Sequence, residues 1–485
     1  MPKLMQKLLK IFEKTISFLI LAIIMFVPLY MKFPSTNIPG TSVAIRLEDF
    51  LIFITLFLWF IYLILSGKIK SMFKDKLNQV ILTFFFIGAL SVFTAIFVSH
   101  SVIPLIGILH YLRRVEMLLL LPLGIWAARN IKGSIYFYLF VVSIVILLVN
   151  LYALGQRLLG FPSISTINAE LAKGLIRFLT PADRVNSTFS GHYDLAIFLM
   201  MGISVISGII FYFIDSKNRF KYPINIKILG LILLVALSLV VLIMTAARLS
   251  FVATILAVFL ALILMKKKKV LLATFFISLL VLIYPTQLRD RLFATVTVNI
   301  QRDWKSYFAV SEDQAKRSRL NIPTLPSVGK KTETIGADAP DIAPGEPVNT
   351  TDLGVYRSMD IRTKVEWPRA IRAFIENPLL GTGYSSLGLA TDNDFLRSLG
   401  EVGLLGTISF IFIFIILIRK YIQVFRKSSG FVRYLAVGML AMTFAVLLNS
   451  TFIDVFEASK VAFIFWIFNG LVFGFMLDKN NVSYD

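Results

Sequence analysis

The chain contains no cysteine, and only three histidines occur among its 485 residues. Without cysteine it can form neither disulfides nor thiolate metal sites. It also lacks the CxxC, HExxH and G-x-x-x-x-G-K-[ST] patterns, which argues against zinc chemistry and a P-loop ATPase. Charged residues are scarce as well, at 16% of the chain. Together these absences point away from soluble, metal-dependent or ATP-dependent enzymes.

Hydrophobic residues are abundant instead. They make up 57% of the chain, and the mean hydropathy is +0.80. No soluble domain of this length has such a composition, so we predict an all-α polytopic membrane protein with about twelve transmembrane helices. The predicted spans lie near residues 14–31, 48–66, 78–98, 112–128, 134–155, 193–214, 227–245, 248–265, 269–284, 402–418, 432–452 and 459–477.

Basic residues predict the orientation of these spans. Lysines precede the first span, which is too long for a signal core and lacks a cleavage site, so we expect it to be retained. With both termini in the cytoplasm, every inner loop carries lysine or arginine, including the short turn Lys266–Lys269. The net charge of +21 therefore indicates topology and attraction to membrane lipids. Nucleic-acid binding is not expected, because the cations are scattered over many loops.

One long polar segment interrupts the hydrophobic pattern. We predict a transmembrane region over residues 1–284, an extracytoplasmic loop over 285–391 between the ninth and tenth helices, and a second transmembrane region over 392–485. The loop should contain helices at Arg289–Leu320 and Val355–Glu376 around a flexible centre, Asn321–Asp352. Two i,i+4 pairs in the second helix, Arg362/Glu366 and Arg372/Glu376, are typical of a solvated helix face.

An arginine lies in the middle of one of the longest apolar runs. The run extends from Ile228 to Met265 and is interrupted only by Thr245-Ala-Ala-Arg248-Leu-Ser250. A charge at mid-bilayer would cost about 2.5–3.5 kcal/mol. We therefore predict a tight hairpin of two helices that brings Arg248 to one membrane face, where it could bind an anion.

Three polar segments should meet at the outer face. They are Arg184–Asp194, the Arg248 turn, and Thr391–Gly406. Arginines supply planar donor pairs suited to phosphate oxygens, and a carboxylate or imidazole could take a proton from a sugar hydroxyl. Transfer of a glycan from a lipid diphosphate needs these groups, and the diphosphate linkage is already activated, so ATP is not required.

In order along the chain, these motifs resemble the O-antigen ligase and O-antigen polymerase superfamily of bacterial membrane glycosyltransferases. The resemblance covers about residues 180–410. It rests on Arg184…Ser-Thr-Phe-Ser-Gly-His-Tyr-Asp-Leu-Ala196, Thr245-Ala-Ala-Arg248-Leu-Ser250, Arg362…Trp367-Pro-Arg-Ala-Ile…Asn377-Pro-Leu-Leu-Gly-Thr-Gly383, and Asp392-Asn-Asp…Leu…Glu401-Val-Gly…Gly406.

The resemblance implies an enzyme of the bacterial cytoplasmic (inner) membrane with its active site facing outside. It implies an undecaprenyl-diphosphate-linked glycan donor, a glycan, lipid or protein acceptor, and no cofactor or metal. Arg184 and Arg248 resemble the diphosphate-binding arginines. Ligases of the family have His-Asn where this chain has Asp392-Asn393, so Asp392 is the first candidate for the catalytic base.

Alternatives remain for several of these residues. His192 and Asp394 are further candidates for the base, and either aspartate could instead cap the following helix. The Asp392-x-Asp394 spacing also resembles metal-binding pairs of other lipid-dependent glycosyltransferases. Glu401 is expected to stabilise its helix. Three charges near the second span, Arg46, Glu48 and Asp49, either line the same cavity or are solvated at the interface, which is the preferred interpretation.

The aspartate in place of the ligase histidine favours a polymerase that joins lipid-linked repeat units. A ligase that passes the finished glycan to a lipid or protein acceptor is the close alternative. From another class, a flippase or exporter would use the same basic cavity without chemistry. No internal repeat is apparent, which weakens that interpretation.

Overall fold

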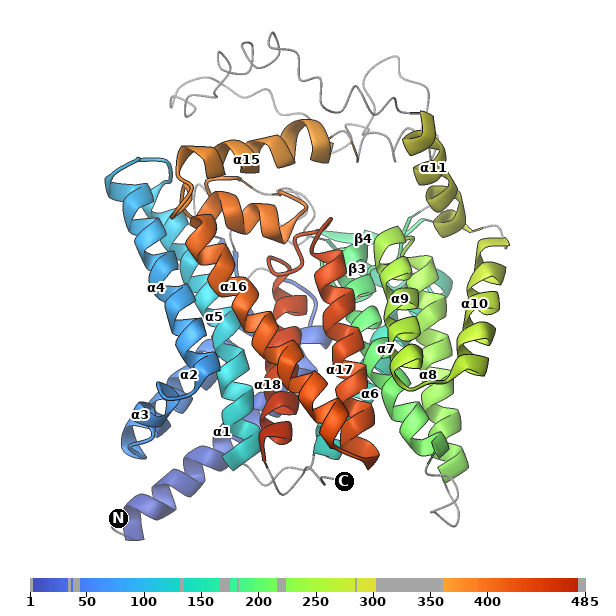
Figure 1. Ribbon diagram of the computed structural model, residues 1–485, viewed down its shortest axis with the longest axis horizontal. Coiled ribbons are helices and arrows are strands. Elements are labelled where there is room, and N and C mark those ends of the chain that lie inside the picture. Colours follow the sequence, from blue (N-terminus) through green and yellow to red (C-terminus); the bar gives the residue numbers. More distant parts are fainter. Residues whose placement is uncertain are drawn as a thin grey trace.

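The computed structural model describes the chain as a bundle of helices with two short antiparallel strand pairs at one end (Figure 1). The described residues are 3–33, 36–37, 44–130, 135–165, 175–180, 183–215, 224–283, 286–301, 359, 361–388 and 390–478.

The first half of the bundle alternates helices with the strand pairs. Its elements are α1 (Lys3–Leu29), β1 (Thr36–Asn37), β2 (Ala44–Ile45), α2 (Leu47–Leu65), α3 (Ile69–Met72), α4 (Lys76–Phe97), α5 (Pro104–Asn130), α6 (Ile135–Leu158), β3 (Pro162–Ile164), β4 (Ile176–Phe178) and α7 (His192–Asp215).

The second half is built from helices joined by turns and loops, among the residues that the structure describes. Its elements are α8 (Ile224–Met244), α9 (Arg248–Leu264), α10 (Lys268–Ile283), α11 (Gln287–Gln301), the π-helix η3 (Ile361–Glu366), α15 (Trp367–Glu376), α16 (Asp394–Lys427), α17 (Gly430–Asn449) and α18 (Ser459–Leu477).

The predicted all-α polytopic membrane fold is confirmed. Nine of the described helices are long and apolar enough to cross a membrane. Each of the twelve predicted spans coincides with a helix, including α5, which carries several charged residues, and α9 and α10, which have only 17 and 16 residues. The number of crossings therefore stays a prediction.

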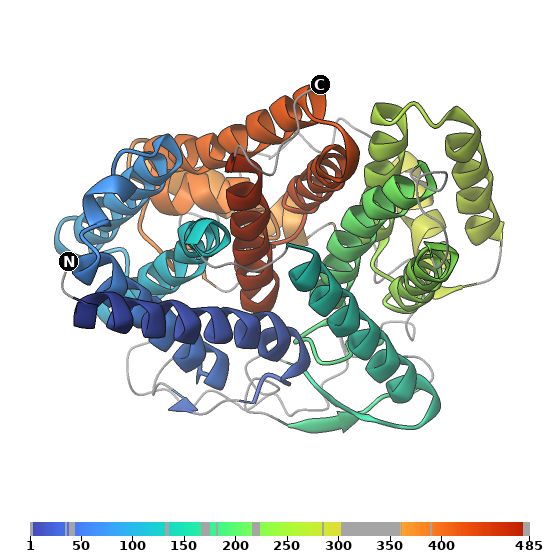
Figure 2. The ribbon, with the colours of Figure 1, turned by 90° about the horizontal axis from the view of Figure 1, so that it is seen from below.

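The centre of the bundle is the contact between α18 and α5, and α18 lies in its middle when seen from below (Figure 2). Glycines allow the two backbones to touch. A Cβ atom on Gly124 would lie 2.6 Å from the carbonyl oxygen of Ile467, and one on Gly470 would lie 2.9 Å from the Cα atom of Gly124. Close backbone approach at small residues is the usual way in which membrane helices pack.

Peripheral helices turn large apolar side chains outward. Phe53 on α2, Phe86 on α4 and Phe276 on α10 are all more than half exposed. In a helix that crosses a membrane, such side chains face lipid, so this surface needs no further protein partner.

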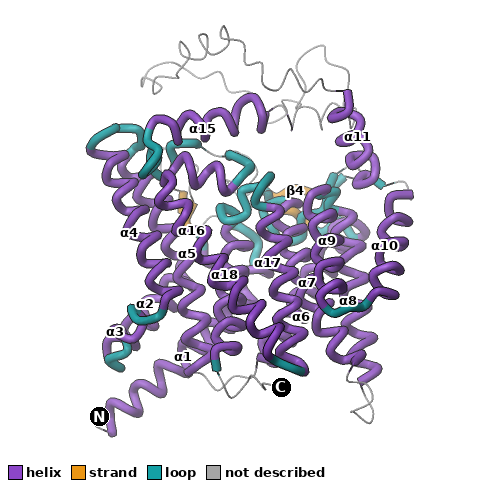
Figure 3. Tube along the Cα trace, in the orientation of Figure 1, coloured by secondary structure: helices purple, strands orange, loops and turns teal. Residues whose placement is uncertain are grey.

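The two ends of the bundle differ. Both chain termini lie at the lower end in Figure 1, together with the turn between α9 and α10. The upper end, which we define as the end that carries α11 and α15, holds both strand pairs and much of the described loop (Figure 3). This arrangement agrees with the predicted sidedness, in which the termini share one side of the membrane.

The predicted extracytoplasmic segment is described only in part. Its first predicted helix begins as α11, and its second corresponds to η3 and α15. Residues 302–358, which include the predicted flexible centre Asn321–Asp352, lie outside the described residues.

A break in α16 shapes the upper end. At Gly403 the backbone leaves the helical region, with φ 65° and ψ −167°. Residues 378–383 occupy the gap: Thr382 N and Gly383 N donate to the carbonyls of residues 400 and 401 over 2.8 and 2.9 Å, and Leu404 N donates to Pro378 O over 2.8 Å. Because unpaired backbone groups are costly in a membrane, this exchange of hydrogen bonds fixes the position of the helix that begins at Asp394.

Sidedness can be tested by cysteine labelling, because the wild-type chain has no cysteine. We expect Arg372→Cys, on exposed α15, to react with an impermeant maleimide added outside cells. Lys268→Cys, at the lower end, should react only after the membrane is opened. Labelling of both variants from the same side would contradict the topology.

Gly403→Ala should destabilise the protein. A Cβ atom there would lie 2.5 Å from Leu380 N, and alanine would be strained at the positive φ. Gly67→Ala is the matched control, since Gly67 has φ 67° but a Cβ atom added to it would have no neighbour within 4 Å. We expect the melting temperature in detergent to fall much further for Gly403→Ala, and equal shifts would show that the α16 break is not a constraint.

Candidate active site

The segment before α7 is folded around one asparagine. The Nδ2 atom of Asn186 donates to Ile164 O (3.0 Å) and Phe189 O (2.8 Å), and its Oδ1 atom accepts from Ser163 Oγ over 2.7 Å. Gln156 on α6 adds hydrogen bonds to both backbone groups of Ser187. These contacts fix the short segment that carries Arg184 and leads into α7.

Arg184 contacts one of the predicted base candidates. Its Nη1 atom lies 2.8 Å from Nε2 of His192, the first residue of α7. A guanidinium can only donate, so Nε2 must be the acceptor in this contact. The lone pair that a base would use is therefore occupied, which favours a positioning role for His192.

The predicted hairpin is present. Helix α8 ends at Met244 and α9 begins at Arg248, with Ala246 at φ 50° between them. The guanidinium of Arg248 reaches across to α11, where it donates to Thr295 Oγ1 and, over 3.4 Å, to Arg291 O. Arg248 thus lies at a helix end, as the sequence predicts, and α11 orients it.

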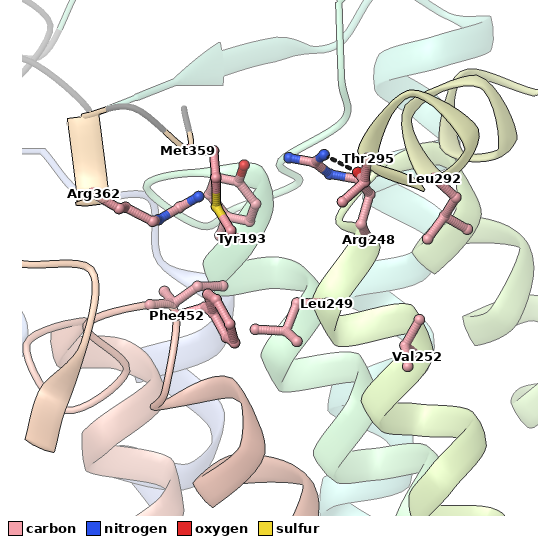
Figure 4. Close-up of a pocket in the computed structure, with 10 residues that line it drawn as sticks. Tyr193, Arg248, Leu249, Val252, Leu292, Thr295, Met359, Arg362 and Phe452 are labelled. Atoms are coloured by element: carbon pink, nitrogen blue, oxygen red, sulfur yellow. Dashed lines mark hydrogen bonds between the residues drawn. The ribbon is translucent and has the colours of Figure 1, made fainter. Parts of the chain in front are cut away.

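Arg248 lines a cavity of about 280 Å³ at the upper end. Arg362 of η3 lines the opposite wall, and Figure 4 shows the two guanidinium groups pointing toward one another. Arg184 does not line the cavity, but both Arg184 and Arg362 lie close enough to Arg248 to interact with it electrostatically. The remaining lining residues are mostly apolar: Tyr193, Leu249, Val252, Leu292, Thr295, Met359, Phe452 and Ile453.

Asp392 lies behind this cavity wall. Its carboxylate forms an ion pair with Arg362 over 2.7 Å, and its side chain keeps 32% exposure. Burial raises the pKa of the Asp392 carboxyl above its ordinary value, although Arg362 favours the charged form. A raised pKa makes the carboxylate a stronger base than an ordinary surface aspartate.

The turn that holds Asp392 is clamped by Asp454, in the loop between α17 and α18. Asp454 accepts from Thr391 N (2.8 Å) and Asn393 N (3.1 Å), on both sides of Asp392, and from Arg397 Nη2 (3.1 Å). Asp392 itself has φ 51°, a strained value for a residue with a side chain. Asp454 is not among the residues predicted from the sequence, because it lies some sixty positions downstream of Asp392, in the loop between two apolar helices.

Asp394 has a different environment. Its carboxylate is buried and accepts from Val455 N over 2.8 Å and from Phe456 N over 3.2 Å. The helix cap is Asn393, whose side chain accepts from Phe395 N and Leu396 N. Asp454 thus binds the backbone beside Asp392, and Asp394 binds the backbone that follows Asp454. These reciprocal contacts favour a structural role for Asp394 over a catalytic one.

A network of charged side chains, which includes buried Arg397 and Glu401, adjoins the clamp through the ion pair of Arg397 with Asp454. Arg397 pairs with Glu401 over 3.5 Å and with Glu457 over 3.9 Å, and Arg114 of α5 also pairs with Glu457. Burial works against the charge on Glu457, yet Arg114 and Arg397 outweigh it and lower the pKa of Glu457. The expected structural role of Glu401 agrees with its contacts, since it also accepts from Ser385 N over 3.1 Å.

Two expectations from the sequence are wrong. Arg362 and Glu366 do not form a solvated face, because Arg362 lines the cavity and Glu366 is only 8% exposed. The charges near α2 are not solvated either: Glu48 is 0% exposed, and Asp49 accepts from Arg46 N over 3.0 Å. Both misinterpretations arose because a charge pattern does not show which helix face another segment covers.

Nothing in the described part of the chain groups three or more histidine and carboxylate side chains as a metal ion would require. Asp392 and Asp394 in particular have different partners, the guanidinium of Arg362 and two backbone amides. Their spacing in the sequence therefore does not translate into a shared ligand set.

Comparison with known proteins supports the resemblance. Residues 233–411 match the family model described as O-Antigen ligase. The match supports the resemblance to the O-antigen ligase and polymerase superfamily over this part of the chain. The matched part includes Arg248, Arg362 and Asp392, whereas Arg184 precedes it. No curated protein matches the chain.

Neutralising the clamp should impair the protein. Asp454→Asn leaves one acceptor oxygen for three donors, and each lost charged hydrogen bond contributes about 1.5–3 kcal/mol. We expect a lower melting temperature. We also expect a marked loss of glycan transfer, because the backbone on both sides of Asp392 is no longer fixed by hydrogen bonds to Asp454.

The control for this change is Asp290→Asn on α11, an exposed residue that pairs with its neighbour Arg289. Exposed pairs contribute little, so its melting temperature should be nearly unchanged. Similar behaviour of the two variants would argue against the clamp.

Proposed function

We propose that the protein is a polysaccharide repeat-unit polymerase. In this proposal it transfers a glycan from an undecaprenyl-diphosphate donor to a sugar hydroxyl on the outer face of the bacterial cytoplasmic membrane. Residues 285–391 then form the outer segment between transmembrane regions 1–284 and 392–485. The observation that carries the proposal is a cavity where arginines from separate segments converge, while its other walls are mostly apolar.

The cavity suits a lipid diphosphate in charge and polarity. Two cations, Arg248 and Arg362, line the cavity, and Arg184 lies within electrostatic range of Arg248. Among the described residues, Asp392 pairs with Arg362 alone, which leaves positive charge for the diphosphate oxygens. Leu249, Val252 and Leu292 provide an apolar wall for the first isoprene units. A water-soluble nucleotide sugar would not need that wall.

The groups support a direct transfer. Asp392 accepts the proton of the acceptor hydroxyl as the hydroxyl oxygen attacks the anomeric carbon. The bond between that carbon and the diphosphate oxygen breaks, and the electron pair leaves on the diphosphate, where the arginines stabilise the added charge. No step requires a nucleotide or a metal ion.

A ligase is the second candidate. The description of the matched family favours it, whereas aspartate at position 392, where ligases have histidine, favours the polymerase. The acceptor distinguishes them: a polymerase lengthens a lipid-linked glycan, and a ligase moves it to another lipid or to a protein.

Incubation of purified protein with lipid-linked repeat units tests the proposal. We expect a ladder of longer lipid-linked glycans. A single transfer to an added acceptor would indicate the ligase, and transport of the lipid-linked sugar without any new linkage would indicate a flippase.

Arginine-to-lysine changes test the cavity. Because lysine lacks the planar donor pair, Arg248→Lys and Arg362→Lys should each weaken donor binding by about 1.5–3 kcal/mol, roughly 10- to 150-fold. Arg372→Lys on the exposed face of α15 is the control and should bind normally. Wild-type affinity in both cavity variants would contradict the diphosphate site.

A further inference from the structure

Glu366 is a buried acid next to the proposed active site. It ends η3, is 8% exposed, and its Oε2 atom is buried without a hydrogen-bond partner among the described residues. Ionising a carboxylate in this position costs free energy unless nearby charges compensate it. A buried polar atom without a partner therefore calls for a structural or functional explanation.

The π-helix explains why Glu366 faces inward. Pro368 near the start of α15 has no backbone N–H and disfavours a regular turn before it. The chain widens into the π-helix Ile361–Glu366, a conformation frequent at functional sites. Arg362 and Glu366 lie four positions apart on it, and both are largely withdrawn from solvent.

Charged groups from four elements face Glu366. They are Arg362 on η3, Arg369 on α15, Asp392 before α16, and Asp454 between α17 and α18. Arg369 is held in place by a 2.6 Å hydrogen bond to Ala390 O. Asp392 is ion-paired with Arg362, and both groups lie within electrostatic range of Glu366.

We propose that Glu366 is a positioning residue for the proton transfer: its negative charge acts on the ion pair of Asp392 and Arg362 and so controls how readily Asp392 takes the proton. The inference rests on the proposed function, in which Asp392 takes the proton of the acceptor hydroxyl. Nothing in the family match assigns a role to Glu366.

The charge of Glu366 determines the direction in which the basicity of Asp392 changes. Burial, followed by the charge of Asp392, raises the pKa of Glu366 to about 7. When Glu366 ionises, its negative charge raises the pKa of Asp392 and draws Arg362 away from it, so Asp392 becomes a stronger base. Below pH 7 Glu366 is protonated and adds no charge, so replacing it by glutamine should weaken Asp392 as a base only above about pH 7.

The test is the pH dependence of product formation with lipid-linked repeat units. In Glu366→Gln we expect the part of the acid limb near pH 7, where Glu366 ionises, to be lost, so that the limb moves to lower pH. The rate on the plateau should fall several-fold, because a weaker base transfers the proton less readily. Glu366→Asp, which keeps the charge at a greater distance, should lie between the wild type and Glu366→Gln.

Two comparisons make the readout specific. Glu376→Gln is the same chemical change at the exposed end of α15 and should leave the profile unchanged. Asp392→Asn should lose about 10²- to 10⁴-fold in rate at every pH.

The outcomes separate the hypotheses. A wild-type acid limb in Glu366→Gln overturns the proposal, and so does complete loss of rate at every pH, which would make Glu366 the base. If Glu366→Gln does not fold, Glu366→Asp decides: a shifted limb supports the proposal and a wild-type limb overturns it. If the wild type forms no new glycosidic linkage, the proposed function itself fails.

Discussion

Every polar group inside a membrane must find its partner within the protein, and this constraint shapes the upper end of the bundle. The break at Gly403 releases backbone groups of α16, and residues 378–383 pair with them. The short helix that starts at Asp394 is thereby set against the loop between α17 and α18. The reciprocal clamp of Asp394 and Asp454 follows from that contact, and with it the position of Asp392.

The charged side chains at this end are subject to the same constraint, but some of them have partners of opposite charge and others do not. Arg397 is buried and Glu457 is half-buried, and each is paired with side chains of opposite sign, so they stabilise the fold without any ligand. Among the described residues, Arg248 has only neutral oxygens of α11 as hydrogen-bond partners, and Arg362 and Arg184 repel it. Such an arrangement is unfavourable by itself, and an anion with several oxygens would relieve it. This difference separates the structural network from the proposed binding site.

The membrane class, the span positions and the Arg248 hairpin could be predicted because each depends on local composition: an apolar run of sufficient length, interrupted by one charge that cannot remain in hydrocarbon. The role of Asp454 could not, because its contacts are with amides some sixty positions away. Arg362 and Glu366 were misread for a related reason. Their i,i+4 spacing describes a helix surface, but only the neighbouring segments determine whether that surface meets water.

The sequence by itself therefore indicated where the chain meets lipid and where it meets water, through its hydropathy and its basic loops. It also indicated which arginines and acids are candidates for chemistry, because the motifs place them in a family pattern. The tertiary structure decided which of those residues act together. Asp392 forms an ion pair with Arg362, whereas the carboxylate of Asp394 accepts hydrogen bonds from backbone amides. His192 contacts Arg184, and Glu366 is buried. Such assignments depend on distances between side chains, and these distances arise only when helices far apart in the chain pack against one another.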